Sequence, residues 1–261
     1  MQNVLVQTIE SFPPLRESVQ RLNAFFLEPE IDRKAFAEVI ESDPMLYSDV
    51  LHYVNAPYYG FRSQIKSVQQ AINLVGLMVV RGFAMRSTLK SYADNDLSPY
   101  GIELPQWLQT MQRQQQFLYH WLMAEDPTAF SKLGGVMFML EMGRLVVSYA
   151  LAFANRTHVF TAQTPHDLLR EEKEVLGEDG DTLAAQLFEQ WNFEPEFVDL
   201  IGHSLDAENA MHPRLAAMLE ITRSLIALHS LRPLETVTYL VVEHGFTFAN
   251  VENAYEKLLD V

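Results

Sequence analysis

Residues 132–157 read KLGGVMFMLEMGRLVVSYALAFANRT, a stretch without proline that is apolar on nearly every side of a helical wheel. A helix of this kind is normally buried in a protein core or in a membrane. Glu141 and Arg144 interrupt the stretch near its middle, and their three-residue spacing places them on one face of a helix. Two charges at that depth favour a core helix with one polar window over a membrane span. The stretch therefore predicts a central buried helix.

The composition describes a globular protein with a large excess of negative charge. The 261 residues include 34 acidic and 19 basic side chains, for a net charge of −15, and 48% of them are hydrophobic. An acidic surface repels phosphate backbones and anionic lipids, so we expect neither nucleic acid nor a membrane as a partner. The absence of cysteine excludes disulfides, thiolate nucleophiles and Cys-ligated zinc. The N-terminus lacks a signal-peptide pattern, which favours a cytoplasmic location.

Helical periodicity continues on both sides of the central stretch, and convincing strand alternation is lacking, so we predict an all-α fold. Asp32, Asp43 and Ser67 stand where helix N-caps are expected. Pro44 suits the first position of the helix that follows Asp43. A helix over residues 105–124 is rich in glutamine, and we expect part of it to be solvated.

Residues 93–103 are rich in Asp, Asn, Ser, Pro and Gly, a composition typical of a break between structural elements. We place a boundary there between two helical lobes. The N-terminal lobe is predicted to span residues 1–95, and the C-terminal lobe residues 96–261.

A second informative stretch, residues 41–77, reads ESDPMLYSDVLHYVNAPYYGFRSQIKSVQQAINLVGL. It has an Asp-Pro helix start, an Asn followed by small and aromatic residues and Gly, and an Ile-x-Ser turn followed by Ala-Ile and Gly. These features lie at Asp43, Pro44, Asn55, Ala56, Tyr59, Gly60, Ile65, Ser67, Ala71, Ile72 and Gly76. The pattern closely resembles the signature of the HDOD family (HD-related output domain). The resemblance covers residues 11–210 and implies an HD-like multi-helix bundle with a helical tail.

HDOD domains are similar to HD-type metal-dependent phosphohydrolases, in which imidazoles and carboxylates converge on a divalent cation that activates a water. The Leu-His-Asp-Ile-Gly-Lys string of those enzymes corresponds to MLEMGR here, so that Leu140, Glu141 and Arg144 replace His, Asp and Lys. One later family histidine falls at Gly180, and of another His cluster only His203 remains. The upstream family histidine falls in the glutamine-rich helix. The resemblance thus implies a vacated metal site, with no metal, no cofactor and no catalytic residue.

Two other groups of residues need an interpretation. Glu141 and Arg144 are predicted to form an ion pair that fills the vacated metal position, although desolvation offsets much of their attraction. The literal His-Asp pair at His166 and Asp167 follows Thr164-Pro165 and is typical of helix N-terminal capping rather than of a metal site.

The aromatic loop after the first signature helix is the candidate interaction surface. It contains Asn55, Tyr58, Tyr59 and Gly60. We expect these residues to pack the two lobes together, with recognition of a partner as the alternative.

The resemblance predicts a non-catalytic output or scaffold protein of bacterial signal transduction that acts through contacts with other signalling proteins. One alternative is a degenerate HD phosphohydrolase acting on nucleotides or cyclic dinucleotides. Another is a sensor that binds a small molecule in the vacated pocket beside Glu141 and Arg144. An open apolar pocket with convergent polar groups would favour the sensor, and a closed site would count against it. Homo-oligomerisation stays open.

Overall fold

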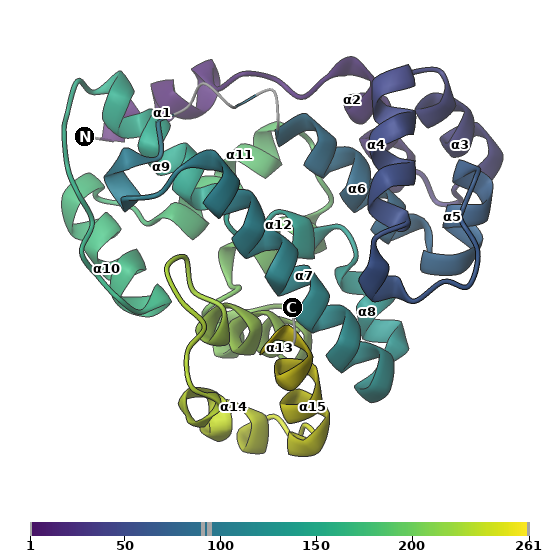
Figure 1. Ribbon diagram of the computed structural model, residues 1–261. Coiled ribbons are helices and arrows are strands. Elements are labelled where there is room, and N and C mark those ends of the chain that lie inside the picture. The colour runs from purple at the N-terminus through teal and green to yellow at the C-terminus, as the bar shows by residue number, and fades with distance from the viewer. Residues whose placement is uncertain (1, 90–91, 93–95, 260–261) are drawn as a thin grey trace.

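The computed structural model describes residues 2–89, 92 and 96–259, and these form an all-α protein (Figure 1). The described residues contain no strand, and their one β feature is an isolated bridge between Ile226 and Leu231. None of the described helices has the length and apolar character needed to cross a bilayer. The predicted fold class is therefore confirmed.

The first part of the chain forms a group of short helices, most of them on one side of the molecule (Figure 1). They are α1 (Gln2–Ser11), α2 (Glu17–Ala24), α3 (Arg33–Glu41), α4 (Pro44–Val54), α5 (Val68–Val75) and α6 (Leu77–Leu89). The predicted N-caps are confirmed, because the side chains of Asp32, Asp43 and Ser67 each accept backbone N–H groups at the start of α3, α4 and α5. Helix α1 was not predicted from the sequence.

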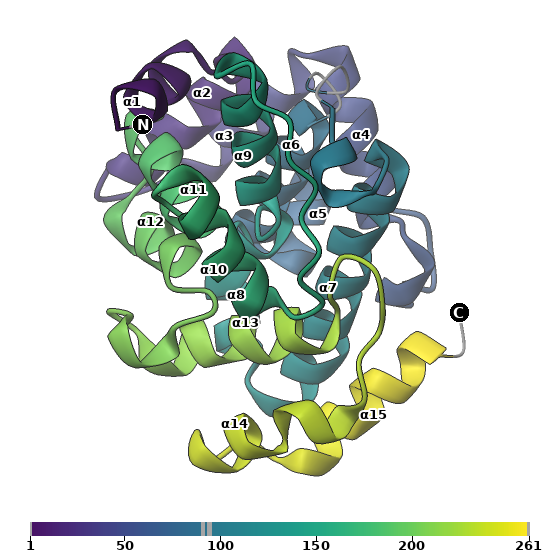
Figure 2. The same cartoon turned by 90° about the vertical axis from the view of Figure 1, so that its left-hand side faces the viewer.

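The rest of the chain includes the long helix α7 (Leu104–Glu125). The other helices are α8 (Pro127–Leu133), α9 (Met142–Phe153), α10 (Pro165–Leu176), α11 (Gly180–Gln190), α12 (Pro195–Gly202), α13 (Pro213–Leu225), α14 (Thr238–Glu243) and α15 (Phe248–Leu259). Helix α15 lies along α7, and α13 to α15 form one end of the molecule (Figures 1 and 2). The C-terminal tail is thus packed on the preceding helices.

The prediction of one continuous helix over residues 132–157 is wrong, although the stretch is buried as expected. Helix α8 ends at Leu133, a short 3-10 helix covers Val136–Phe138, and α9 begins at Met142. The break follows the close approach of α6, because a Cβ atom on Gly134 would lie 2.7 Å from the backbone nitrogen of Val79. Tight packing against α6 therefore outweighs local helical periodicity.

The glutamine-rich helix α7 is more buried than its composition suggests. Gln109 and Gln112 are exposed as expected, but the side chains of Gln114 and Gln115 are fully buried. The Gln115 amide donates a 2.9 Å hydrogen bond to the hydroxyl of Tyr59. The Nε2 atoms of both amides donate hydrogen bonds inside the core, where a buried donor without an acceptor is costly.

A buried arginine links α6 to the segment before α12. Arg81 donates hydrogen bonds of 2.5 and 2.8 Å to the carboxylate of Glu194 and another to Asn23. Its guanidinium lies 4.0 Å from the ring centroid of Phe26. The helices on either side of the predicted lobe boundary are thus fastened to each other, while residues 93–95 of that boundary lie outside the described part. The division into two lobes stays a prediction.

Candidate functional site

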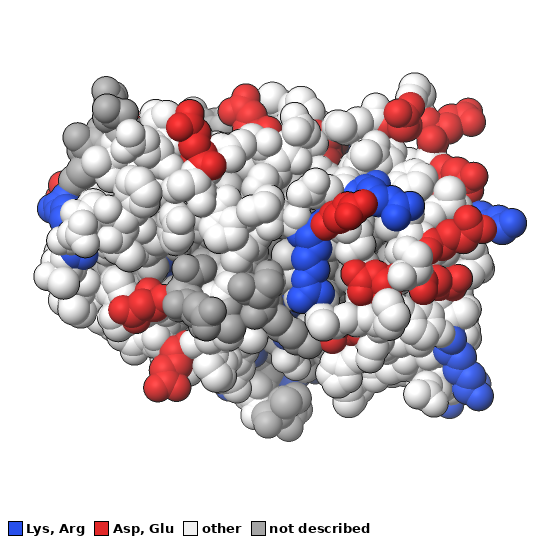
Figure 3. Space-filling view, turned by 90° about the horizontal axis from the view of Figure 1, so that it is seen from above, with Lys and Arg blue, Asp and Glu red and all other residues white. Residues whose placement is uncertain are grey.

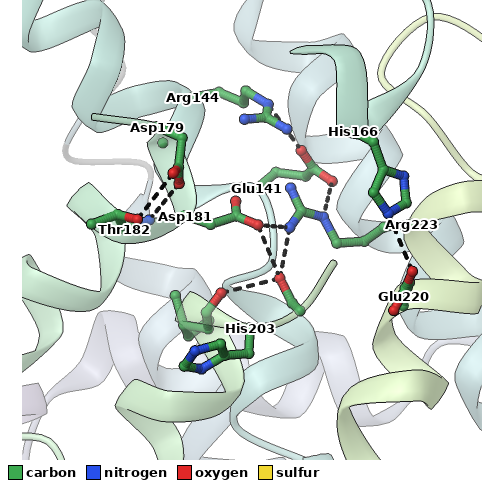
Figure 4. Close-up of polar contacts among 12 residues, drawn as sticks. Glu141, Arg144, His166, Asp179, Asp181, Thr182, His203, Glu220 and Arg223 are labelled. Carbon is green, nitrogen blue, oxygen red and sulfur yellow. Dashed lines mark hydrogen bonds and ion pairs between the residues drawn. The ribbon is translucent and has the colours of Figure 1, made fainter. Parts of the chain in front are cut away.

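Five charged side chains meet around Glu141, which the family resemblance places at the metal position of HD enzymes, and all five are almost fully buried. We call Glu141, Arg144, Glu172, Asp181 and Arg223 the charge cluster. They come from the start of α9 and from α9, α10, α11 and α13. Figure 4 shows the guanidinium of Arg223 pointing between the carboxylates of Glu141 and Asp181. The cluster thus ties four helices together through charges.

Arg144 holds two of the carboxylates. Its Nη1 lies 2.8 Å from Oε1 of Glu172, and its Nε lies 3.6 Å from Oε2 of Glu141. The predicted proximity of Glu141 and Arg144 is therefore observed, with Glu172 as a second partner that the sequence did not indicate. Burial by itself would lower the pKa of Arg144, but the charges of Glu172 and Glu141 outweigh burial and raise it.

Arg223 holds the other side of the cluster. Its Nε lies 3.4 Å from Oε1 of Glu141, and its Nη1 donates to Asp181 and, at 2.6 Å, to the hydroxyl of Ser204. Burial would lower the pKa of Arg223, and the neighbouring carboxylates of Asp181 and Glu141 raise it instead. Both guanidiniums are therefore held in the charged state.

Glu172 accepts three hydrogen bonds in a fully buried position. Its donors are Nη1 of Arg144 at 2.8 Å, the Tyr100 hydroxyl at 2.7 Å and the backbone N–H of Gly180 at 2.8 Å. Burial raises the pKa of this carboxyl, although all three donors act in the opposite direction. The cluster holds three carboxyl groups against two guanidiniums, so a raised pKa at Glu172 reduces the cost of the excess negative charge.

Helix α7, in which the resemblance places the upstream family histidine, supplies an amide to the cluster. Nε2 of Gln114 donates 2.7 and 3.0 Å hydrogen bonds to Oε1 of Glu141 and to the carbonyl of Ile226. The indole nitrogen of Trp107 donates a 3.0 Å bond to the backbone carbonyl of Glu141. Glu141 is thus engaged through both its side chain and its backbone.

The residues at this position do not fit a metal ion. The Leu140 side chain is apolar and buried, and Glu141 is paired with two cations. A Cβ atom on Gly180 would lie 2.9 Å from Oε2 of Glu172 and 3.2 Å from Nη1 of Arg144, so an imidazole has no room there. Within residues 2–89, 92 and 96–259, no group of three or more His, Asp or Glu side chains could hold a metal. The guanidiniums of Arg144 and Arg223 occupy the space beside Glu141 that a metal cation would need.

The site is also nearly closed to small molecules. The cavity that borders Glu141 and Arg144 has a volume of about 20 Å³, and residues 162–165 and 227–229 contribute to its wall. A single water needs roughly 10–15 Å³. The geometry therefore counts against a sensor that binds a small molecule here.

His203 and His166 each pair with a carboxylate outside the charge cluster. His203 Nδ1 lies 3.0 Å from Oδ1 of Asp199, at the end of α12, and Figure 4 draws no contact from it to the charge cluster. His166 pairs with Glu220 on α13 at 3.2 Å. Asp167 instead accepts a 2.7 Å bond from the Thr164 hydroxyl, which in turn caps α10. The capping interpretation of this His-Asp pair agrees with these contacts.

The aromatic loop packs mainly against α7. Asn55 exchanges two hydrogen bonds with the backbone of Ile65, of 2.7 and 2.9 Å, and so closes the loop. Tyr59 is buried, and its ring centroid lies 4.8 Å from that of Tyr119. Tyr58 is half-buried and Gly60 is exposed. These contacts agree with the packing role, and a recognition role for the loop stays a prediction.

Comparison with known proteins identifies the family. The sequence matches the HDOD domain over residues 12–207. The chain belongs to the HDOD family. The family match ends before α13, so the HDOD charge cluster described above is completed by Arg223 from outside the matched region.

Solved structures show the same HDOD-type fold. A virulence factor from Campylobacter jejuni has 26% identity and a TM-score of 0.54, with 99% of this chain and 100% of that one covered. A protein from Marinobacter aquaeolei VT8, provisionally named for signal transduction, has 20% identity and a TM-score of 0.66, with 99% and 62% covered. A provisionally named phosphohydrolase from Shewanella amazonensis SB2B has 18% identity and a TM-score of 0.64, with 98% and 93% covered. No curated protein matches the sequence.

Several members of the site were missed from the sequence, and one of them left a local signal. Glu172 stands four residues after Leu168 and four before Leu176, on the buried face of amphipathic helix α10. A charge inside an apolar stripe indicates a buried partner. Asp181 and Gln114 give no such signal, because polar residues surround them in the sequence.

Proposed function

We propose that this HDOD protein is a non-catalytic regulatory module that acts through contacts with other signalling proteins. The observation that carries the proposal is that Glu141, expected at the metal position of HD enzymes, is paired with arginines inside the buried charge cluster. A metal-dependent phosphohydrolase needs ligands that converge on an open coordination position. Here the carboxylate of Glu141 forms ion pairs with Arg144 and Arg223 and accepts a hydrogen bond from Gln114.

The charge cluster also supports a mechanical role. Buried ion pairs that bridge several helices lose much of their energy to desolvation, but they fix how the helices sit because an unpaired buried charge is costly. The cluster links α9, α10, α11 and α13. Helices held in fixed positions present a defined surface to a partner. We propose that the aromatic loop with Asn55, Tyr58, Tyr59 and Gly60 is the part of this surface that the partner contacts.

The first test separates this role from catalysis. The purified protein is incubated with Mn²⁺, Fe²⁺ or Zn²⁺, desalted, and measured for metal content and for hydrolysis of phosphodiesters and nucleotides. We expect no stoichiometric metal and no turnover. Bound metal that is lost in Glu141→Gln but kept in Glu174→Gln, an exposed carboxylate on α10, would overturn the proposal.

The second test is complementation in the native cell. A strain lacking the gene is supplied with the wild type, Glu141→Gln, or a Tyr58 variant that carries a photo-crosslinking side chain. We expect Glu141→Gln to restore function when it is folded, as checked by circular dichroism, and position 58 to cross-link to a discrete partner. Loss of function in a folded Glu141→Gln protein, together with no cross-link, would refute a contact-based role.

A further inference from the structure

A large cleft lies outside the charge cluster, beside α4 and the aromatic loop. It is a cleft of about 700 Å³, bordered by α4, by residues 55–58 and 64–66, and by single side chains of α6 and α7. Small-molecule sites in proteins typically have volumes of about 300–1,000 Å³. The cleft is therefore large enough for a ligand the size of a metabolite, whereas the cavity at the charge cluster is not.

The charge of this cleft is opposite to that of the protein. Its lining includes Lys66, Arg86 and His52 but no Asp or Glu, although the chain has 34 acidic residues and a net charge of −15. Neither Lys66 nor Arg86 forms an ion pair with any described residue. The acidic side chains in the view of Figure 3 are spread over the surface, and the basic ones do not form a continuous patch. Basic groups without acidic neighbours in a hollow attract an anion.

The side chain of Arg86 is held in place, but its hydrogen bonds to other side chains are weak. Its Nη atoms lie 3.4 and 3.5 Å from the amide oxygens of Gln112 and Gln115, which are long distances for hydrogen bonds. Its Nε is buried and has no hydrogen-bond partner among the described residues. The guanidinium lies 4.7 Å from the ring centroid of Tyr53, which limits its movement. A planar guanidinium held in this way is suited to bind a phosphate or a carboxylate through two donors.

The walls of the cleft are preformed and partly aromatic. The Asn55 amide donates to the carbonyls of Leu51 and Ile65 and accepts from the backbone N–H of Ile65, which fixes the loop. The Tyr47 hydroxyl donates a 3.1 Å bond to the carbonyl of Lys66. Tyr58 is half-buried at the edge of the cleft and is braced by Tyr59, with ring centroids 4.4 Å apart. A fixed tyrosine ring beside a cationic group provides a surface for a flat, unsaturated ring.

We propose that this cleft binds a small anion that carries a planar ring, of the size and chemistry of a nucleoside monophosphate. The anionic group lies at Arg86 and Lys66, and the ring lies against Tyr58. Inorganic phosphate alone leaves most of the volume unfilled, and a neutral nucleoside leaves both cations without a counterion. The site differs from the metal position of HD enzymes and does not depend on the regulatory role proposed above.

The test uses isothermal titration calorimetry with four probes, AMP, GMP, guanosine and inorganic phosphate, at low ionic strength. We expect saturable binding of at least one nucleotide, and binding at least about tenfold weaker for guanosine and for phosphate, because one charge-assisted contact contributes about that factor. Failure of both nucleotides to bind would overturn the proposal.

Matched charge variants then locate the site. Lys66→Gln and Arg86→Gln each remove one positive charge from the lining, while Arg62→Gln removes an exposed charge from the same loop outside it. We expect about tenfold weaker nucleotide binding in each of the first two, and less than about twofold change in the third. Equal weakening by all three would indicate a nonspecific charge effect and refute the cleft.

Backbone amide shifts provide a readout that does not depend on the variants. Shifts induced by the nucleotide in the wild-type protein should centre on residues 47–66 and on Arg86. Shifts centred at any other part of the chain would overturn the proposal even if Arg86→Gln unfolds.

Discussion

Removal of the Arg223 guanidinium is the most direct test of how the charge cluster stabilises the fold. The change Arg223→Met keeps the length and apolar stem of the side chain but leaves Glu141 and Asp181 without a shared cation. At the 3.4 Å separation of Arg223 and Glu141, a pair of unit charges interacts by about 5 kcal/mol if the effective dielectric constant is roughly 20. Desolvation of the arginine offsets part of this, and measured losses for broken buried pairs are about 3–5 kcal/mol. We expect a loss in that range.

The assay is urea unfolding followed by circular dichroism at 25 °C, in which the change in midpoint multiplied by the slope gives the loss of stability. The matched control is Arg214→Met on the same helix, which removes an exposed arginine 3.9 Å from Glu125. This control should cost no more than about 1 kcal/mol, as for surface pairs. The double change Arg223→Met with Asp181→Leu should cost less than the sum of the two single changes, because each removes the partner of the other.

A loss below about 1 kcal/mol for Arg223→Met, equal to that of Arg214→Met, would refute the reasoning. It would mean that Glu141 and Asp181 become protonated or hydrated at little cost when Arg223 is absent, and that the cluster does not hold the helices in place.

Three further outcomes are expected. Asp43→Ala should cost about 1 kcal/mol in urea unfolding because α4 loses its N-cap, and Asp43→Asn should stay within a few tenths of the wild type, so equal losses would contradict the capping role. Gly143→Ala should lose about 1–3 kcal/mol, since its Cβ would lie 2.5 Å from the carbonyl of Gly180, and a gain in stability would contradict this close approach. Burial, and then the charge of Lys257, lowers the pKa of His120 below 6.5. The contribution of the neutral His120 to stability is therefore present above pH 6.5 and decreases as the pH falls toward the pKa of the folded state. An NMR titration midpoint of His120 at or above 6.5 would contradict this expectation.

Local features were predictable because they depend on neighbouring residues alone. The caps at Asp32, Asp43 and Ser67 follow from side chains that reach backbone N–H groups two or three positions ahead. The same is true of the all-α class, which follows from the spacing of apolar residues. The proximity of Glu141 and Arg144 also lies within one helical turn.

The continuity of helices was not predictable from periodicity. Residues 132–157 have an apolar pattern without proline that favours one helix, but Gly134 allows α6 to approach so closely that the chain turns at Val136–Phe138. Whether the continuous or the broken helix has the lower free energy depends on packing between segments some fifty positions apart.

The sequence by itself determined the helical class and the family, and the family resemblance predicted that Leu140 and Gly180 stand where metal-binding histidines are expected. Only the tertiary structure decided which groups pair around Glu141. Gln114 and Arg223 come from α7 and α13 and contact Glu141, while Glu172 comes from α10 and contacts Arg144. The packing of apolar faces brings them together, and because that packing is not directional, the sequence does not show which charged residues will pair. Because a buried ion without a partner is costly, each buried carboxylate of the cluster needs a neighbouring group of opposite charge. The fold therefore decides which residues of the cluster must be charged.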